Sequence, residues 1–131
     1  MPDRKARVLL VEDNPGLLDT LADILRVSDM DVDTALDAPA AFAMIADGRY
    51  DVAVVDMVLP GPSGVEVIRK FKSSSSATRI IICTAYDNSG LLAEAQALGV
   101  DRTVHKPADP AALIAFIKEL AEPSAPNEDK F

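Results

Sequence analysis

Three carboxylates, one hydroxyl and one ammonium group stand at the ends of short apolar runs in this sequence. Glu12 and Asp13 follow the first run, Asp56 the third, Thr84 the fourth and Lys106 the fifth. Carboxylates that are packed together repel one another, so a group of three favours a hard divalent cation bound through oxygen. Because neither His nor Cys is among these residues, such a site favours Mg²⁺ or Mn²⁺ over Zn²⁺.

Such an arrangement is suited to phosphoryl transfer. A carboxylate beside a divalent metal can attack phosphorus and carry an acyl phosphate. The Lys106 ammonium would then neutralise the phosphoryl oxygens, and the Thr84 hydroxyl would donate a hydrogen bond to one of them. Taken singly, each of these residues has a plainer interpretation, such as a solvated strand end or a surface lysine. The chemical interpretation therefore depends on their meeting at one edge of the fold.

The elements that would bring these residues together repeat five times along the chain. Each apolar run is followed by a segment with helical periodicity and a start signal of its own, such as Asn14-Pro15. Ser63 and Glu66 have the spacing of a helical capping box, and residues 73–76 are typical of a polar loop. The apolar runs are 8–11, 32–34, 52–55, 80–83 and 103–104.

Five β–α repeats predict an α/β fold, a doubly wound (βα)5 arrangement with one five-stranded parallel sheet and helices on both faces. The first, third and fourth runs are apolar throughout, as expected of strands that are covered on both faces. The second and fifth runs include polar residues, which predicts that they form the edges. This pattern agrees with the flavodoxin-like strand order 2-1-3-4-5, in which ligands bind beyond the carboxyl ends of the strands. The candidate residues all fall at those ends.

With these motifs in these places, the sequence resembles the receiver domains of two-component response regulators over nearly its whole length. Each motif alone is weak, and their common order at strand ends makes the resemblance specific. We expect the receiver domain to occupy residues 1–121 and residues 122–131 to be a Pro-rich acidic tail or linker stub. The motifs are Glu12-Asp13, Asp56 followed by Pro60 and Gly64, Thr84-Ala85, and Lys106-Pro107.

The resemblance implies that Asp56 is a phosphoacceptor. Its phosphoryl group would come from a sensor histidine kinase or a histidine phosphotransfer protein, and a downstream effector protein or domain would respond. Thr84 would be the switch hydroxyl, and Lys106 would contact the phosphoryl group. The Lys106-Pro107 bond would be cis, which is permitted because Pro follows. Such a chain is regulatory and would catalyse only its own phosphorylation and dephosphorylation.

The same resemblance implies the metal ligands. Asp13, Asp56 and the backbone carbonyl of Val58 would bind Mg²⁺, with Mn²⁺ as an alternative, and Glu12 would reach the ion mainly through water. In receivers, the side chains two residues beyond the phosphoacceptor and beyond the switch hydroxyl flank the approach of water. Here these are Val58, which has no polar atom, and Tyr86, which is bulky. We therefore expect slow self-dephosphorylation, unless Tyr86 simply packs on the fourth helix.

One position departs from the receiver pattern. Receivers usually carry Tyr or Phe three residues before the lysine, and Thr103 stands there. We therefore expect weaker coupling between Thr84 and the output surface formed by the fourth helix, the fifth strand and the fifth helix. Tyr86 is an aromatic that could replace part of this function. The alternative is a phosphorylation-independent, receiver-like protein-interaction module.

Two other functions that use similar residues are disfavoured. Haloacid-dehalogenase-type phosphotransferases need a second acid two residues after the aspartate, and Val58 stands two residues after Asp56. Flavodoxin-like binders of flavin mononucleotide need a phosphate-binding loop after the first strand. Glu12 and Asp13 in that place would repel the phosphate.

The composition excludes further classes. The formal net charge is −8, and no cluster of Lys and Arg is present to bind a nucleic-acid backbone directly. No apolar stretch approaches the roughly 20 residues that span a bilayer. The single cysteine, Cys83, excludes an internal disulfide and is expected to be an inert, buried thiol. We therefore expect a cytoplasmic domain that interacts with neither nucleic acid nor membrane.

Overall fold

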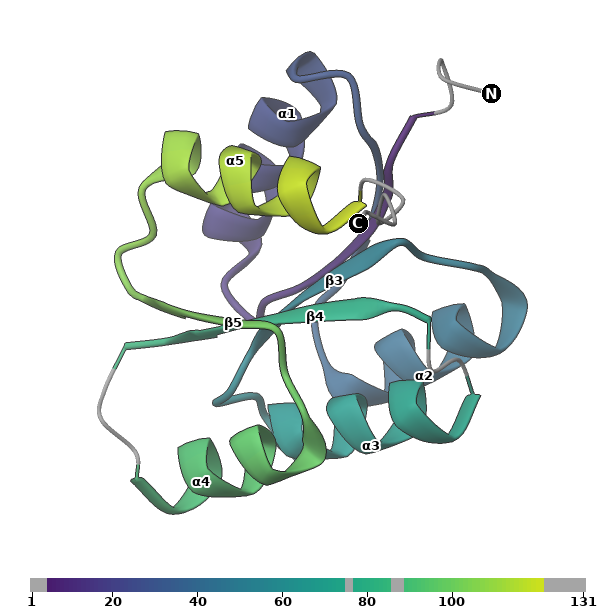
Figure 1. Ribbon diagram of the computed structural model, residues 1–131, viewed down its shortest axis with the longest axis vertical. Coiled ribbons are helices and arrows are strands. Elements are labelled where there is room, and N and C mark those ends of the chain that lie inside the picture. The colour runs from purple at the N-terminus through teal and green to yellow at the C-terminus, as the bar shows by residue number, and fades with distance from the viewer. Residues whose placement is uncertain (1–4, 75–76, 86–88, 122–131) are drawn as a thin grey trace, which may run out of the picture.

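The computed structural model describes residues 5–74, 77–85 and 89–121, and Figure 1 shows their arrangement. Strands and helices alternate along the whole of this part of the chain, as the sequence predicts. The predictions about Tyr86 and residues 122–131 lie outside the described residues. The elements are β1 (Arg7–Val11), α1 (Pro15–Val27), β2 (Asp31–Ala35), α2 (Ala38–Asp47), β3 (Val52–Asp56), α3 (Gly64–Ser74), β4 (Arg79–Thr84), α4 (Ser89–Leu98), β5 (Arg102–His105) and α5 (Pro110–Ala121).

The five strands form one parallel sheet in the order β2-β1-β3-β4-β5, which confirms the predicted order and both predicted edge strands. In Figure 1, α1 and α5 lie on one face of the sheet and α2, α3 and α4 on the other. Val11 of β1 is in register with Val55 of β3, and Asp56 with Cys83 of β4. The carboxyl ends of the central strands therefore meet at one edge.

The hydrophobic core is divided by the sheet. Leu9 and Val11 of β1 belong to the cluster that also contains Phe71 of α3, whereas Val8 and Leu10 belong to the cluster on the α1 and α5 face. Successive side chains of a strand point to opposite faces, so a strand that is apolar at every position fills both halves of the core. None of the helices in the described part of the chain combines the length and the apolar character needed to cross a bilayer.

The start and end of α3 differ from the sequence prediction in detail. The Ser63 hydroxyl caps the helix by accepting a hydrogen bond from the Val65 backbone N–H, at 3.2 Å. The Glu66 carboxylate lies 3.4 Å from the Arg69 guanidinium, so its described contact is with the next turn of the helix and not with the cap. The helix also continues to Ser74, so the first two residues of the predicted polar loop are helical.

Candidate functional site

Three carboxylates converge at the carboxyl edge of the sheet. Glu12 follows β1 and is buried, Asp13 beside it is exposed, and Asp56 is the buried last residue of β3. One oxygen of each lies within 4.8 Å of the others, and in the described part of the chain this is the group that could hold a metal ion. The sequence therefore predicted both the members of the cluster and their meeting, because parallel strands end at the same edge.

Lys106 supplies the positive charge of the cluster. Its Nζ donates to Glu12 Oε1 at 2.6 Å and to Asp56 Oδ2 at 2.9 Å. Both carboxylates are almost fully buried, and an isolated buried carboxylate is unstable. The ammonium group thus stabilises both anions.

The contact between Lys106 and Glu12 was not predicted from the sequence. The resemblance to receivers implies that Glu12 contacts the metal through water and that Lys106 contacts the phosphoryl group. These two residues lie 94 positions apart, and no local pattern links them. Glu12 is also held from the other side, because its Oε2 accepts a hydrogen bond from the Asn14 backbone N–H at 3.1 Å.

Asp56 is positioned by the loop that follows it. Its Oδ1 accepts a hydrogen bond from the Val58 backbone N–H at 3.2 Å, and the Gly64 N–H donates to the Met57 carbonyl at 3.0 Å. The Gly64 backbone lies so close that a Cβ atom there would overlap the Asp56 carbonyl oxygen. The first turn of α3 is therefore packed directly against the backbone of the phosphoacceptor candidate, which explains a glycine at this position.

Thr84 and Lys106 are joined through the backbone. Thr84 is the last residue of β4 and is 1% exposed. The Lys106 N–H donates to the Thr84 carbonyl at 2.8 Å, so the end of β4 and the loop after β5 form one connected edge beside Asp56. The peptide bond between Lys106 and Pro107 is cis, as expected.

The electrostatics of the site follow from crowding. Partial burial, the hydrogen bond with Glu12 and the negative charge of Glu12 raise the pKa of Asp13 above its ordinary value. Burial by itself lowers the pKa of Lys106, but hydrogen bonds to Glu12 and Asp56 outweigh burial and raise the pKa above its ordinary value. Lys106 therefore stays protonated, whereas the negative charge of Asp13 is poorly compensated by the protein. Oxygen ligands with excess negative charge match a hard divalent ion such as Mg²⁺.

Two further residues belong to the site region. Cys83 is buried beneath the site, and burial raises the pKa of its thiol to about 12. The thiol is thus protonated and inert, as predicted. Val58 follows Asp56 by two residues, and its side chain is 48% exposed.

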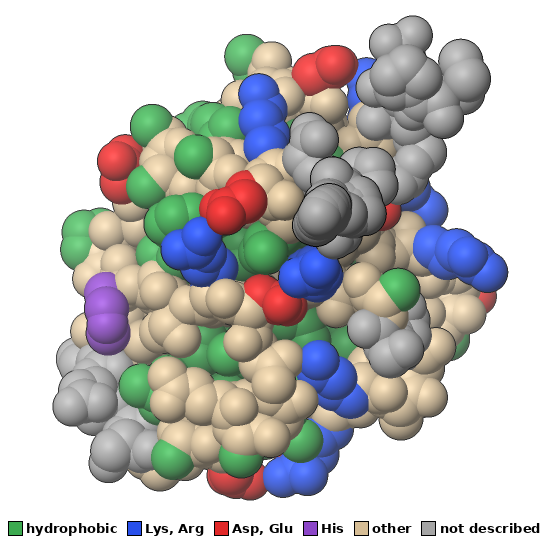
Figure 2. Space-filling view, viewed as in Figure 1, with side chains coloured by type: hydrophobic (Ala, Val, Ile, Leu, Met, Phe, Trp, Pro, Cys, Tyr) green, Lys and Arg blue, Asp and Glu red, His purple; other side chains and the backbone are tan. Residues whose placement is uncertain are grey.

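Thr103 lies on the edge strand β5 and is half-buried. Figure 2 shows positive and negative side chains intermixed over β5 and α5, whereas the part of this face over α4 is mainly uncharged. Arg102 of β5 lies 2.8 Å from the Glu119 carboxylate of α5 and stacks over the Phe116 ring at 4.6 Å. This guanidinium therefore ties β5 to α5 on the outer side of the sheet.

Comparison with known proteins agrees with this geometry. The family model of the response regulator receiver domain matches residues 8–118. The sensory transduction protein RegX3 of Mycolicibacterium smegmatis is 34% identical over 122 residues, which cover 93% of this chain and 53% of that protein. The chain thus spans about half the length of the curated relatives it matches.

Solved structures show the same fold. A CheY-like response regulator receiver domain protein from Methanospirillum hungatei superposes with a TM-score of 0.85 and 27% identity, covering 90% of this chain and 94% of that one. The response regulator protein TrrA from Thermotoga maritima, solved in complex with Mg²⁺-BeF, gives a TM-score of 0.78 and 29% identity, covering 88% of this chain and 98% of that one.

Proposed function

Since the chain belongs to the response regulator receiver domain family, we propose that Asp56 accepts a phosphoryl group in a Mg²⁺-dependent reaction. The donor is a phosphohistidine on a sensor histidine kinase or a histidine phosphotransfer protein. A carboxylate oxygen of Asp56 attacks phosphorus, the bond between phosphorus and the imidazole nitrogen breaks, and an acyl phosphate forms. The chain catalyses this reaction on itself and the later hydrolysis of the acyl phosphate, in which water attacks phosphorus and releases inorganic phosphate from Asp56, and it acts as a regulator.

The observation that carries the proposal is the position of Lys106. Its ammonium lies 2.9 Å from Asp56 Oδ2. From there it can contact the phosphoryl oxygens and stabilise the negative charge that develops on them during transfer. Because Thr84 is joined to Lys106 through the backbone, its side chain is at the right edge of the sheet to bind another phosphoryl oxygen. Attraction between Lys106 and Glu12 keeps the ammonium in place before the donor arrives.

The carboxylates are suited to Mg²⁺. Asp13, Asp56 and the backbone carbonyl of Val58 would bind the ion, and Glu12 would contact it through water. Bound there, the ion would supply positive charge against the phosphoryl oxygens. The excess of carboxylates over cations at this edge supports the assignment, as does the related protein TrrA, whose structure holds Mg²⁺-BeF.

We propose further that phosphorylation changes the surface formed by α4, β5 and α5. Thr84 and Lys106 would move toward the phosphoryl group, and the backbone between them would carry the change to β5. Because Thr103 stands where receivers usually carry an aromatic residue, we expect a smaller rearrangement. Changes in backbone amide chemical shifts on adding beryllofluoride should reach β5. Changes limited to the loops around the carboxylates would contradict this part of the proposal.

Val58 and Tyr86 are proposed to set the lifetime of the acyl phosphate. Val58 has no polar atom that could orient water for in-line attack, and Tyr86 is bulky enough to cover the phosphoryl group, so dephosphorylation should be slow. The double variant Val58→Asn, Tyr86→Glu should lose phosphate faster than wild type, as measured on purified phosphorylated protein. Equal rates would show that these positions do not control the lifetime.

The test of phosphoacceptor function is modification by acetyl phosphate, followed by mass spectrometry of the intact protein. Wild type and Asp19→Asn, which removes an exposed carboxylate of α1 outside the site, should gain one phosphoryl group with Mg²⁺ and none with a chelator. Asp56→Asn should gain none under either condition. A wild-type protein that stays unmodified with donor and Mg²⁺ would refute the proposal.

The second candidate function is a phosphorylation-independent interaction module, favoured by Thr103 alone. It predicts that a binding partner has equal affinity for the chain with and without beryllofluoride. Because the curated relatives are about twice as long as this chain, the effector that responds to the receiver, residues 1–121, is either a covalently attached domain or a separate protein.

A further inference from the structure

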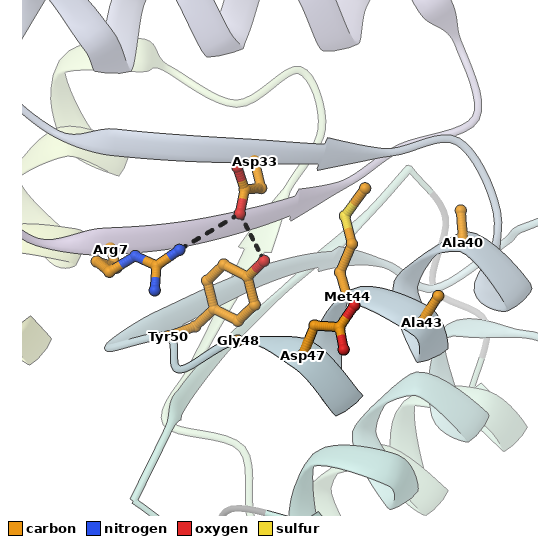
Figure 3. Close-up of a pocket in the computed structure, with 8 residues that line it drawn as sticks. All are labelled: Arg7, Asp33, Ala40, Ala43, Met44, Asp47, Gly48 and Tyr50. Atoms are coloured by element: carbon orange, nitrogen blue, oxygen red, sulfur yellow. Dashed lines mark hydrogen bonds and ion pairs between the residues drawn. The ribbon is translucent and has the colours of Figure 1, made fainter.

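A second surface with a defined chemistry lies at the opposite end of the sheet from Asp56. It is a groove of about 460 Å³ between the edge strand β2 and the last turns of α2, shown in Figure 3. Ala40, Ala43 and Met44 of α2 give it an apolar side. Asp33 of β2 and Asp47 of α2 stand on its two borders, and Arg7 beside Asp33 also lines it.

Asp33 is held in place by its neighbours. Its Oδ2 accepts a hydrogen bond from the Tyr50 hydroxyl at 2.6 Å and lies 3.5 Å from the Arg7 guanidinium. The Arg7 guanidinium also stacks over the Tyr50 ring, at 5.2 Å. Burial and the hydrogen bond to Asp33 raise the pKa of Tyr50, so its hydroxyl remains a donor. Asp33 is therefore a fixed carboxylate, and the fold already places one guanidinium against this border.

The opposite border carries an uncompensated charge. Asp47 is exposed at the end of α2, and within the described residues it forms no ion pair. The surrounding segment, residues 27–48, contains no Lys or Arg. It contains five aspartates, at positions Asp29, Asp31, Asp33, Asp37 and Asp47. Lys5 and Arg7 pair with Asp29 and Asp33, so Asp47 is the carboxylate of the groove lining whose charge has no ion-pair partner among the described residues.

These properties select the kind of group that fits. Arg7, the cation of the groove lining, is already paired with Asp33, and an anion would be repelled by Asp47. A metal ion needs several carboxylates close together, and within the described residues that arrangement occurs around Asp56 and does not include Asp33 or Asp47. A long basic side chain matches both features, because its methylene stem covers apolar surface while its charged end contacts carboxylates.

We propose that this groove binds an arginine or lysine side chain from a basic segment of a partner protein. The stem would lie along Ala40, Ala43 and Met44, and the charged end would contact Asp33 and Asp47. Arg7 begins β1 and Tyr50 precedes β3, whereas Asp56 ends β3. Binding in the groove is thus independent of the state of Asp56 and provides a constant attachment for a partner, whatever the outcome of the phosphorylation test.

The test uses a short peptide of alternating Arg and Ala, acetylated and amidated, with a matched peptide in which citrulline replaces Arg. Each is titrated into the whole chain in saturating Mg²⁺, and backbone amide shifts are followed by NMR. The Arg peptide should shift the amides of β2 and the second half of α2, with the same affinity when beryllofluoride is added. The citrulline peptide, which has the same shape without the charge, should cause no shift.

Two variants and a control locate the binding. Asp47→Asn should weaken the Arg peptide about threefold, as expected for one partly solvated ion pair. Ala43→Lys should weaken it about tenfold, because the new ammonium neutralises Asp47 and fills the groove. Asp19→Asn, with the same loss of charge on α1, should leave the affinity unchanged within error.

Three results would overturn the proposal. If Asp19→Asn weakens binding as much as Asp47→Asn, the peptide responds to the net charge and not to the groove. If the citrulline peptide binds equally, a cation is not required. If the same amides shift with protein concentration in the absence of peptide, the occupant is a second copy of this chain.

Discussion

Gly64 offers the sharpest test of how the loop after β3 holds Asp56. The residue begins α3 and is buried against the backbone of the preceding loop. A Cβ atom at this position would overlap the Asp56 carbonyl oxygen and would lie 2.9 Å from Met57 Cα. All these neighbouring atoms belong to the backbone, so no side-chain rotation can relieve the overlap. In Gly64→Ala either the start of α3 or the end of β3 must move.

The size of the effect follows from these distances. Carbon atoms in contact prefer a separation of about 3.5–4.0 Å, so the loop must shift by a large part of an ångström. Overpacking of this kind typically costs about 1–3 kcal/mol. Because the overlapping atoms belong to the backbone and cannot rotate away, we expect the cost of Gly64→Ala to lie at the upper end of this range. For a domain of this size the loss corresponds to roughly 10 °C in melting temperature. Because the overlapping backbone includes that of Asp56, Mg²⁺ binding should weaken as well.

The assay is urea denaturation followed by circular dichroism, since the chain has no Trp. Gly16→Ala is the matched control, because a Cβ there would meet Asn14 Oδ1 at 3.5 Å, an ordinary contact. Gly16 lies in the first turn of α1, so the control should be neutral or more stable by about 0.5–1 kcal/mol. If Gly64→Ala matches Gly16→Ala in free energy of unfolding and binds Mg²⁺ normally, the reasoning about the close backbone approach is wrong.

Three further predictions concern single residues. Asp13→Asn should raise the free energy of unfolding of the metal-free protein at neutral pH, because the repulsion between Asp13 and Glu12 is removed. The variant should also bind Mg²⁺ more weakly in a calorimetric titration. A variant that is less stable than wild type would contradict the idea that the carboxylates are crowded. Asp29→Gly should be more stable by about 1 kcal/mol, because Asp29 has a φ of 71°, a backbone conformation that glycine adopts more readily. The exposed ion pair between Asp29 and Lys5, which the variant loses, contributes little. An unchanged midpoint of urea denaturation would count against this prediction. Burial raises the pKa of the Cys83 thiol from 9.0 to about 12, so the unfolded chain loses this proton first as the pH rises. Wild type should therefore lose stability above pH 9.0 relative to Cys83→Ala. Parallel pH profiles of stability for the two proteins would show that the thiol is not buried as described.

The sequence by itself determined the fold and the members of the carboxylate cluster. Apolar runs without interruption predict strands covered on both faces, and polar residues in the second and fifth runs predict edges; both are local patterns. Once the strands are parallel, residues such as Glu12 and Asp56 must share an edge of the sheet. The meeting of distant residues was predictable because it follows from topology and needs no knowledge of side-chain packing.

Only the tertiary structure decided which partners the charged groups choose. Glu12 contacts Lys106 directly, and Glu66 faces Arg69 instead of completing a capping box. The hydrogen bond from the Tyr50 hydroxyl to Asp33 likewise follows from no pattern in the sequence. The physical reason is that a hydrogen bond requires its atoms to be placed within a few tenths of an ångström. Such precision depends on register, rotamers and helix packing together, whereas periodicity in a sequence specifies only the face and the end of an element on which a residue lies.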